Sequence, residues 1–174
     1  MAKDMTIDLR LEANEFRKWI HQKVSLVAKG KAAKSSSKPI GAIVALYCYV
    51  QDGWIALDFN TDDEFEFDGD VSKVAWRDLF QRPTWQAFAE SEDTASMTFI
   101  EADGTKSSKV AAKMTDRFLS THFGKMIAEA LTAAWNDGVF SSLALKPKCV
   151  LSVNDFNGNW GWEARKSSGE RASA

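Results

Sequence analysis

The sequence has few of the residues that build disulfide-bonded folds or histidine-based sites. Its 174 residues include two cysteines, two histidines and three prolines. Two cysteines cannot supply the disulfide framework by which small secreted domains compensate for a limited core. Cys48 and Cys149 each lie in an apolar run, which favours buried, free thiols on strands. A disulfide between them would require neighbouring strands with a suitable Cα separation.

Long apolar runs and catalytic signatures are also lacking. No run approaches the roughly 20 residues of a membrane-spanning helix, and the first 15 residues carry acids where a secretory signal would be apolar. We therefore expect a cytoplasmic protein without membrane contact. His21 and His122 have no partner at a metal-binding spacing, and no nucleophile elbow or phosphate-binding glycine loop occurs. The sequence predicts no catalytic residue, metal ligand or cofactor.

Apolar residues, in contrast, are plentiful. They form 45% of the chain and include seven tryptophans and eleven phenylalanines, enough to build a core without a disulfide or a structural metal. We predict one domain over residues 1–165 and a short, polar, disordered tail over residues 166–174.

The first half of the chain predicts a helix followed by a hairpin. Apolar residues recur every three or four positions from Leu9 to Val27, as on one face of an amphipathic helix. Residues 40–50 are continuously apolar, which is typical of a central strand covered on both faces. Turn residues 51–53 then lead into a second, antiparallel strand over residues 54–59.

The second half predicts further helices and strands. Residues 74–90 suggest short helices broken near Pro83, and residues 96–105 suggest a short strand with an Asp-Gly turn. A long helix is expected over residues 107–137, with Gly138 as its stop.

An Asn-Gly bend between residues 149–153 and 159–164 predicts a closing hairpin. The element order indicates an α+β fold. We expect a mostly antiparallel sheet against which the N-terminal helix and the long helix of the C-terminal half pack.

The most unusual stretch is DFNTDDEFEFDGD, residues 58–70, which holds seven carboxylates and no lysine or arginine. A calcium loop is not indicated, because Asp63 or Phe67 would stand where the turn glycine is required. A catalytic carboxylate pair is disfavoured, because so many like charges indicate a solvated face. A partner-binding surface and a simple solubility role remain as alternatives.

A partner-binding surface would combine these charges with nearby aromatic side chains, since aromatic anchors inside a charged rim are common at tight interfaces. The predicted interface residues are Asp58, Asp62, Asp63, Glu64, Glu66, Asp68, Asp70 and Trp54.

A basic segment lies elsewhere in the chain. Residues 16–51 hold seven basic residues and no acids, as a phosphate-binding surface would. The formal net charge of −2, the pI near 5.7 and the lack of a recognisable motif favour a solvated helix face and loop over nucleic-acid binding.

The stretch ALYCYVQDGWIALDFNTDDEF, a strand, a glycine turn, a second strand and then acids, resembles small α+β immunity proteins of bacterial polymorphic toxin and contact-dependent growth inhibition systems. The later VLSVNDFNG is similar to the closing strand of some of these proteins. The resemblance implies a cytoplasmic protein that binds and blocks one cognate toxin domain, often a nuclease with a basic active site. The acids would then stand in for nucleic-acid phosphates.

The leading hypothesis is therefore a non-catalytic binding protein for a basic toxin domain. One alternative is a small metal-dependent hydrolase or nuclease whose clustered carboxylates hold Mg²⁺ or Mn²⁺. Another is an assembly subunit that associates through exposed aromatic side chains.

Overall fold

The computed structural model describes residues 3–29, 38–48, 53–61, 74–82, 94–110, 113 and 115–165. In this part of the chain, two long helices pack against two separate sheets, most of whose strand pairs are antiparallel. The predicted α+β fold is confirmed. The predicted tail, residues 166–174, lies outside the described residues.

The larger sheet has five strands. In spatial order they are β4 (Val74–Gln81), β3 (Trp54–Asn60), β2 (Ile40–Cys48), β7 (Leu145–Asp155) and β8 (Gly161–Arg165). Only the β2–β7 pair is parallel. Strand β2 is central, as predicted. Its Ile43 and Tyr47 belong to the main core, while Ala42 and Val44 are equally buried in a small cluster on the opposite face.

The smaller sheet has three strands: β1 (Lys3–Asp8), β5 (Thr94–Ile100) and β6 (Lys106–Val110). The short strand and Asp-Gly turn predicted for residues 96–105 are confirmed as β5 and the turn to β6, where Gly104 has a φ of 84°. Met97 and Phe99 of β5 are fully buried, whereas most of β6 is exposed. This sheet is therefore buried on one face.

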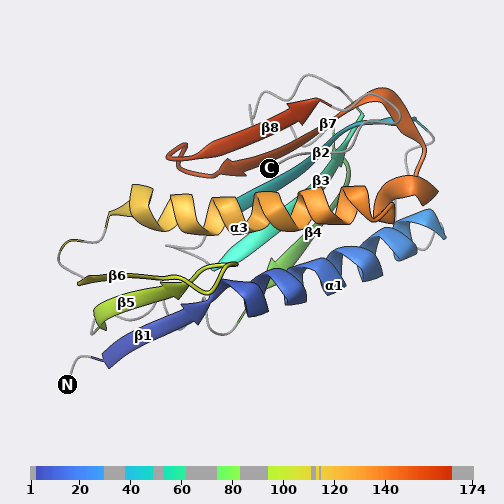
Figure 1. Ribbon diagram of the computed structural model, residues 1–174. Coiled ribbons are helices and arrows are strands. Elements are labelled where there is room, and N and C mark those ends of the chain that lie inside the picture. Colours follow the sequence, from blue (N-terminus) through green and yellow to red (C-terminus); the bar gives the residue numbers. More distant parts are fainter. Residues whose placement is uncertain are drawn as a thin grey trace.

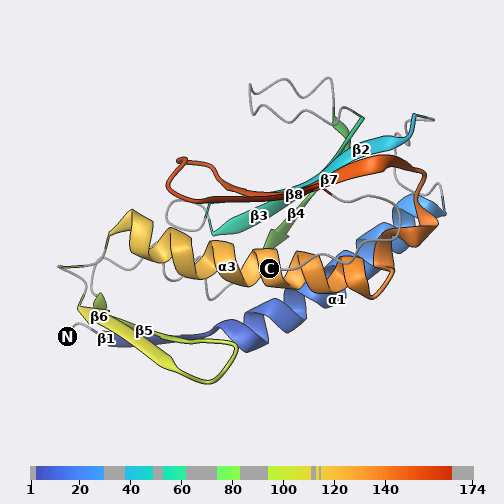
Figure 2. The same cartoon turned by 45° about the horizontal axis from the view of Figure 1, so that its top comes forward.

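Two helices, α1 (Leu9–Ala28) and α3 (Asp116–Asn136), lie side by side on one face of the five-stranded sheet (Figure 1; Figure 2). Strand β1 leads directly into α1, and the three-stranded sheet lies near the N-terminal ends of both helices (Figure 2). A short 3₁₀ helix, η3 (Val139–Ser142), follows α3. One apolar cluster joins both helices to both sheets.

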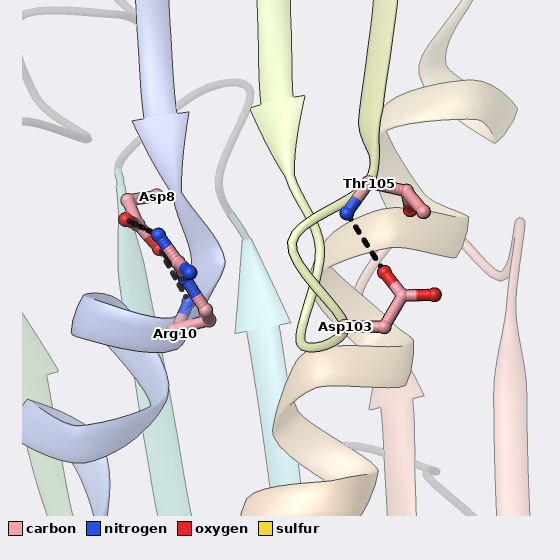
Figure 3. Close-up of polar contacts among 4 residues, drawn as sticks. All are labelled: Asp8, Arg10, Asp103 and Thr105. Carbon is pink, nitrogen blue, oxygen red and sulfur yellow. Dashed lines mark hydrogen bonds and ion pairs between the residues drawn. The ribbon is translucent and has the colours of Figure 1, made fainter.

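Side chains at the helix ends explain where the helices start and stop. Asp8 caps α1 by accepting a hydrogen bond from the Arg10 backbone N–H. The Arg10 guanidinium also donates two hydrogen bonds to the same carboxylate (Figure 3). Thr115 caps α3 through the Phe118 N–H. Gly138, at φ 73°, directly follows the α3 C-cap, which confirms the predicted helix stop.

A glycine inside α3 permits a close approach to the sheet. A Cβ atom on Gly124 would lie 2.3 Å from Cε3 of Trp160 and 2.6 Å from the Tyr47 hydroxyl. The helix therefore accepts the small conformational penalty of glycine in order to pack against these two rings.

The predicted helices over residues 74–90 are wrong for the part that is described, because residues 74–81 form β4. The pattern has the period of a strand: Trp76 and Phe80 pack against the main core, while Arg77 and Leu79 are exposed. Pairing with β3 supplies the backbone partners that favour a strand here. Pro83 lies outside the described residues.

The long helix begins later than the predicted start at residue 107. Residues 106–110 form β6, which pairs with β5, and the helix starts at Asp116 after the Thr115 cap. The serines and lysines of β6 suit an exposed edge strand as well as a helix surface, so composition did not separate the two.

The closing hairpin is confirmed as β7 and β8, which pair antiparallel around a turn with Gly158 at φ 71°. Cys149 on β7 is a buried free thiol whose pKa is raised to about 12 by burial. Strand register places Cys149 beside the start of β2, and Cys48 ends that strand about 20 Å away at roughly 3.3 Å per residue. A disulfide within this chain is thereby excluded.

Candidate partner-binding surface

The first residue of the acidic stretch is not a free surface charge. Asp58 and Arg77 lie directly opposite each other on β3 and β4. The Arg77 guanidinium donates from Nε to Oδ1 at 2.7 Å and from Nη2 to Oδ2 at 2.6 Å, and Asp58 is only 1% exposed. The interpretation of Asp58 as an uncompensated, solvated carboxylate is wrong. Its partner was missed because it lies on a strand that was predicted as helix.

This ion pair links β3 to the edge strand β4 near the point where the acidic connection begins. We define the acidic connection as residues 62–73, which join β3 to β4 and contain six carboxylates and one lysine. A two-pronged Arg–carboxylate contact fixes both the distance and the orientation of the two strands. Because Asp58 and Arg77 neutralise each other, the pair adds little to the field around the connection.

The other predicted acids, Asp62, Asp63, Glu64, Glu66, Asp68 and Asp70, lie outside the described residues. Their role at an interface stays a prediction. What the structure does give is the position of the ends of the connection. Asn60, near the end of β3, pairs with Ala42, near the start of β2. The acidic connection and residues 30–37, which precede β2, therefore leave the described structure at the same end of the five-stranded sheet.

Trp54 lies at the opposite end of β3. It pairs with Cys48 and Gln81, and seven residues of extended chain, about 20 Å, separate it from Thr61. Its ring contacts Phe156 edge-on, with centroids 6.3 Å apart. Trp54 and Thr61, after which the acidic connection begins, therefore lie at opposite ends of β3.

A hollow of about 280 Å³ adjoins this aromatic pair, and we call it the acidic hollow. The residues that line it are Leu46, Ser152, Asn154, Asp155, Phe156, Gly158 and Glu163. Ser152 and Glu163 lie directly opposite each other on β7 and β8. Phe156 is 48% exposed. Two of these lining residues, Asp155 and Glu163, carry carboxylates.

A buried hydrogen-bond network lies beneath the hollow. Oδ2 of Asp155 accepts hydrogen bonds from Ser120 Oγ at 2.9 Å, Asn159 N at 3.2 Å and Asn159 Nδ2 at 3.0 Å, while Oδ1 accepts one from Asn157 N at 3.2 Å. The Tyr47 hydroxyl donates to the Ser120 carbonyl at 2.9 Å, and burial raises the Tyr47 pKa. These bonds tie the β7–β8 turn to α3 and β2.

The basic part of α1 is largely neutralised by acids. Arg17 pairs with Asp137 at 2.7 Å and Lys18 with Glu15 at 2.7 Å. Lys23 pairs with Asp78 of β4. These ion pairs agree with the interpretation of the basic segment as a solvated helix face. Because the neighbouring acids offset these charges, the described part of this segment presents a weaker positive potential to a nucleic acid than its sequence suggests.

The two histidines have different surroundings. His21 is exposed on α1, whereas His122 contacts Glu101 and stacks on Phe99, with ring centroids 4.8 Å apart. Within the residues that the structure describes, no group of three or more potential metal ligands occurs. None of the helices in the same part of the chain has the length and apolar character needed to cross a bilayer.

Comparison with protein-family models, curated proteins and solved structures gives no match for this chain. Function must therefore be argued from charge and geometry. The five-stranded sheet offers two candidate regions, the acidic connection at one end and the acidic hollow with its aromatic pair at the other.

Proposed function

We propose that this chain is a non-catalytic binding protein that neutralises a cognate bacterial toxin domain carrying a basic surface, as an immunity protein does. The acidic connection would supply the electrostatic part of the interface, through Asp62, Asp63, Glu64, Glu66, Asp68 and Asp70. If the toxin is a nuclease, these carboxylates occupy the basic site that otherwise binds phosphates.

The observation that carries this proposal is the Asp58–Arg77 pair at the base of the acidic connection. Binding residues are commonly presented by loops on a rigid scaffold. Here the two strands that bear the connection are held together by their backbone ladder and by a half-buried, two-pronged ion pair. The structure thereby anchors both ends of the most acidic segment in the chain.

The charge balance supports the same conclusion. Asp58 is paired internally, so the six acids of the connection are opposed within it by Lys73 alone. A concentration of like charge of this size accelerates encounter with an oppositely charged protein and weakens encounter with acidic ones. That behaviour is useful for an inhibitor that must find one toxin quickly.

The proposal is tested by capture from a lysate of the native organism. The bait is the tagged full chain at low salt, compared with a D62K/D63K variant and with a D4K/E129K variant of the same net charge. The control positions lie on β1 and α3, and neither of these elements bears the acidic connection. We expect wild type and D4K/E129K to retain the same basic protein, with D62K/D63K losing it.

Mass spectrometry identifies the captured protein, and an activity assay on the purified complex then decides whether it is inhibited. Retention of the same protein by all three baits would exclude the acidic connection as the binding surface. Capture of a protein whose activity is unchanged in the complex would exclude neutralisation as the function.

A further inference from the structure

We propose that His122 and Glu101 form a proton-sensitive contact that stabilises the three-stranded sheet against the start of α3. His122 lies near the N-terminal end of α3, and Glu101 directly follows β5. The three-stranded sheet lies beside this end of the helix (Figure 2). Histidine is the side chain that ordinarily changes charge between about pH 5 and pH 8, so a contact made by its ring can change strength over that range.

The imidazole is held in place by aromatic rings. It stacks on Phe99 with ring centroids 4.8 Å apart and 9° between the planes, and it meets Phe118 at 4.4 Å and 68°. Phe99 is fully buried, and the His122 side chain is only 17% exposed. Water can therefore offset only part of the charge of a protonated ring at this position. A neighbouring opposite charge contributes more here than it would on the open surface.

Glu101 supplies that opposite charge. Its Oε1 contacts Nδ1 of His122, and its side chain is 19% exposed. This oxygen is buried and accepts no well-directed hydrogen bond from the described residues. A neutral imidazole would keep the contact by directing an N–H at the oxygen, whereas the attraction between an imidazolium and a carboxylate depends less on direction. The strength of the contact therefore comes from the charge of the ring.

Other charged groups surround the pair. They are Arg117, Lys125 and Glu129 on α3, Arg10 on α1, Lys106 and Lys109 on β6, Asp103 in the β5–β6 turn and Lys113 ahead of α3. Lys109 lies over the Phe118 ring, 4.5 Å from its centroid, so its positive charge opposes a positive charge on the imidazole. Lys125 is paired with Glu129 at 4.0 Å. Within the described part of the chain, Glu101 is the charged group in direct contact with the imidazole, and attraction at contact outweighs charges farther away.

The contact should be stronger at acidic than at basic pH. While the ring is protonated, its attraction to Glu101 stabilises the folded protein. This stabilisation is lost as the pH rises through the range in which histidine gives up its proton. Phe99 and Phe118 still pack against the neutral ring, so the three-stranded sheet stays attached to α3 but is held less firmly.

A double-mutant cycle at two pH values tests the inference. Glu101→Gln removes the carboxylate charge with little change in size, and His122→Phe keeps an aromatic ring against Phe99 without a charge. At about pH 5.5 we expect the two changes to be coupled, with the contact shifting the unfolding equilibrium roughly threefold to fivefold. At about pH 8 the two changes should be nearly independent. Urea denaturation of wild type, both single variants and the double variant gives the coupling.

The Lys125–Glu129 pair on α3 provides the matched control. Lys125→Gln and Glu129→Gln form a cycle between two groups that keep their charges at both pH values, so their coupling should not change with pH. Circular dichroism shows whether each variant is folded. If His122→Phe does not fold, His122→Gln takes its place in the cycle with the same expected result.

Amide hydrogen exchange adds a local measurement. Protection factors correct for the pH dependence of intrinsic exchange. In wild type they should fall several-fold in β5 and β6 between about pH 5.5 and about pH 8, relative to those in β2 and β3. In Glu101→Gln this relative fall should disappear, because the charge that holds the imidazolium is gone.

Coupling of equal size at both pH values would show that the contact does not depend on the charge of the ring. Absence of coupling at both would show that the two side chains do not interact in solution. Either result overturns the inference. These measurements use the chain without a partner, so their outcome is independent of the proposed function.

Discussion

The two ends of the five-stranded sheet differ in the polar contacts that stabilise them and in the side chains that they carry. At one end, the acidic connection joins two strands that are linked by the half-buried Asp58–Arg77 ion pair. The other carries the acidic hollow and two aromatics above a hydrogen-bond network centred on Asp155. Long-range charge mainly raises association rates, whereas desolvated anchors mainly lower dissociation rates. Under the proposed function, the acidic connection would therefore act mainly on the association rate.

The largest expected effect comes from breaking the ion pair under the acidic connection. Arg77→Ala leaves the Asp58 carboxylate buried without its partner, which should lower the free energy of unfolding by about 3 kcal/mol, near the low end for a buried pair because water reaches Arg77. Urea denaturation measures this. Arg10→Ala breaks the more exposed Asp8 pair and should cost much less, because solvent screens that pair. Equal losses would mean that burial of Asp58 is energetically unimportant.

The next effect is expected at the opposite end, where Gly124 meets Trp160 and Tyr47. Gly124→Ala should destabilise the protein by about 1–3 kcal/mol, because its Cβ would overlap the Trp160 ring. Helix propensity alone predicts the opposite sign, a gain of roughly 1 kcal/mol. Thermal unfolding decides between them, with exposed Thr121→Ala as the control. A more stable Gly124→Ala protein would show that the helix does not approach the rings this closely.

The hydrogen-bond network under the acidic hollow comes third. Asp155→Asn keeps the size of the side chain but replaces one acceptor oxygen with an NH₂ group. That group would face the hydrogen-bond donors of Ser120, Asn157 or Asn159. We expect a loss of about 2 kcal/mol in stability and faster amide exchange at Asn157 and Asn159. Hydrogen exchange by NMR reports both quantities. Unchanged protection at these two amides would indicate that the turn is held by its backbone alone.

The smallest effect concerns the charge at the α1 cap, away from both ends. Hydrogen bonds from the Arg10 guanidinium, helped by the Arg10 and Leu11 backbone N–H groups, lower the Asp8 pKa from its ordinary value of 3.8 to about 2 (Figure 3). A lowered native pKa stabilises the fold above about pH 4, and this stabilisation is lost as the pH falls towards 2.

Asp8→Asn tests this, since asparagine also caps helices but carries no charge. The stability difference from wild type should be present at pH 5 and should disappear near pH 2, in unfolding experiments at each pH. A difference that persists at pH 2 would show that it arises from packing and not from the charge.

Much of the fold could be predicted because its signals are local. The apolar period of α1 and the doubly buried composition of β2 each follow from residues within the element. Strands β4 and β6 could not be predicted in this way. Trp76, Arg77 and Leu79 fit either an amphipathic helix or a strand, and only pairing with β3 decides.

The candidate sites depend even more on tertiary structure. The acidic stretch is visible in the sequence, yet the Asp58–Arg77 pair requires the β3–β4 register, which no local pattern encodes. The acidic hollow was missed because Ser152 and Glu163 come together only when the closing hairpin pairs.

The most direct test of the central claim is the association rate of the captured partner as a function of salt concentration. Stopped-flow measurements would compare wild type, D62K/D63K and D4K/E129K. The acidic connection as the steering surface predicts that D62K/D63K associates roughly tenfold more slowly at low salt and loses most of its salt dependence, while D4K/E129K behaves nearly as wild type. Identical rates and salt dependences for all three proteins would contradict it.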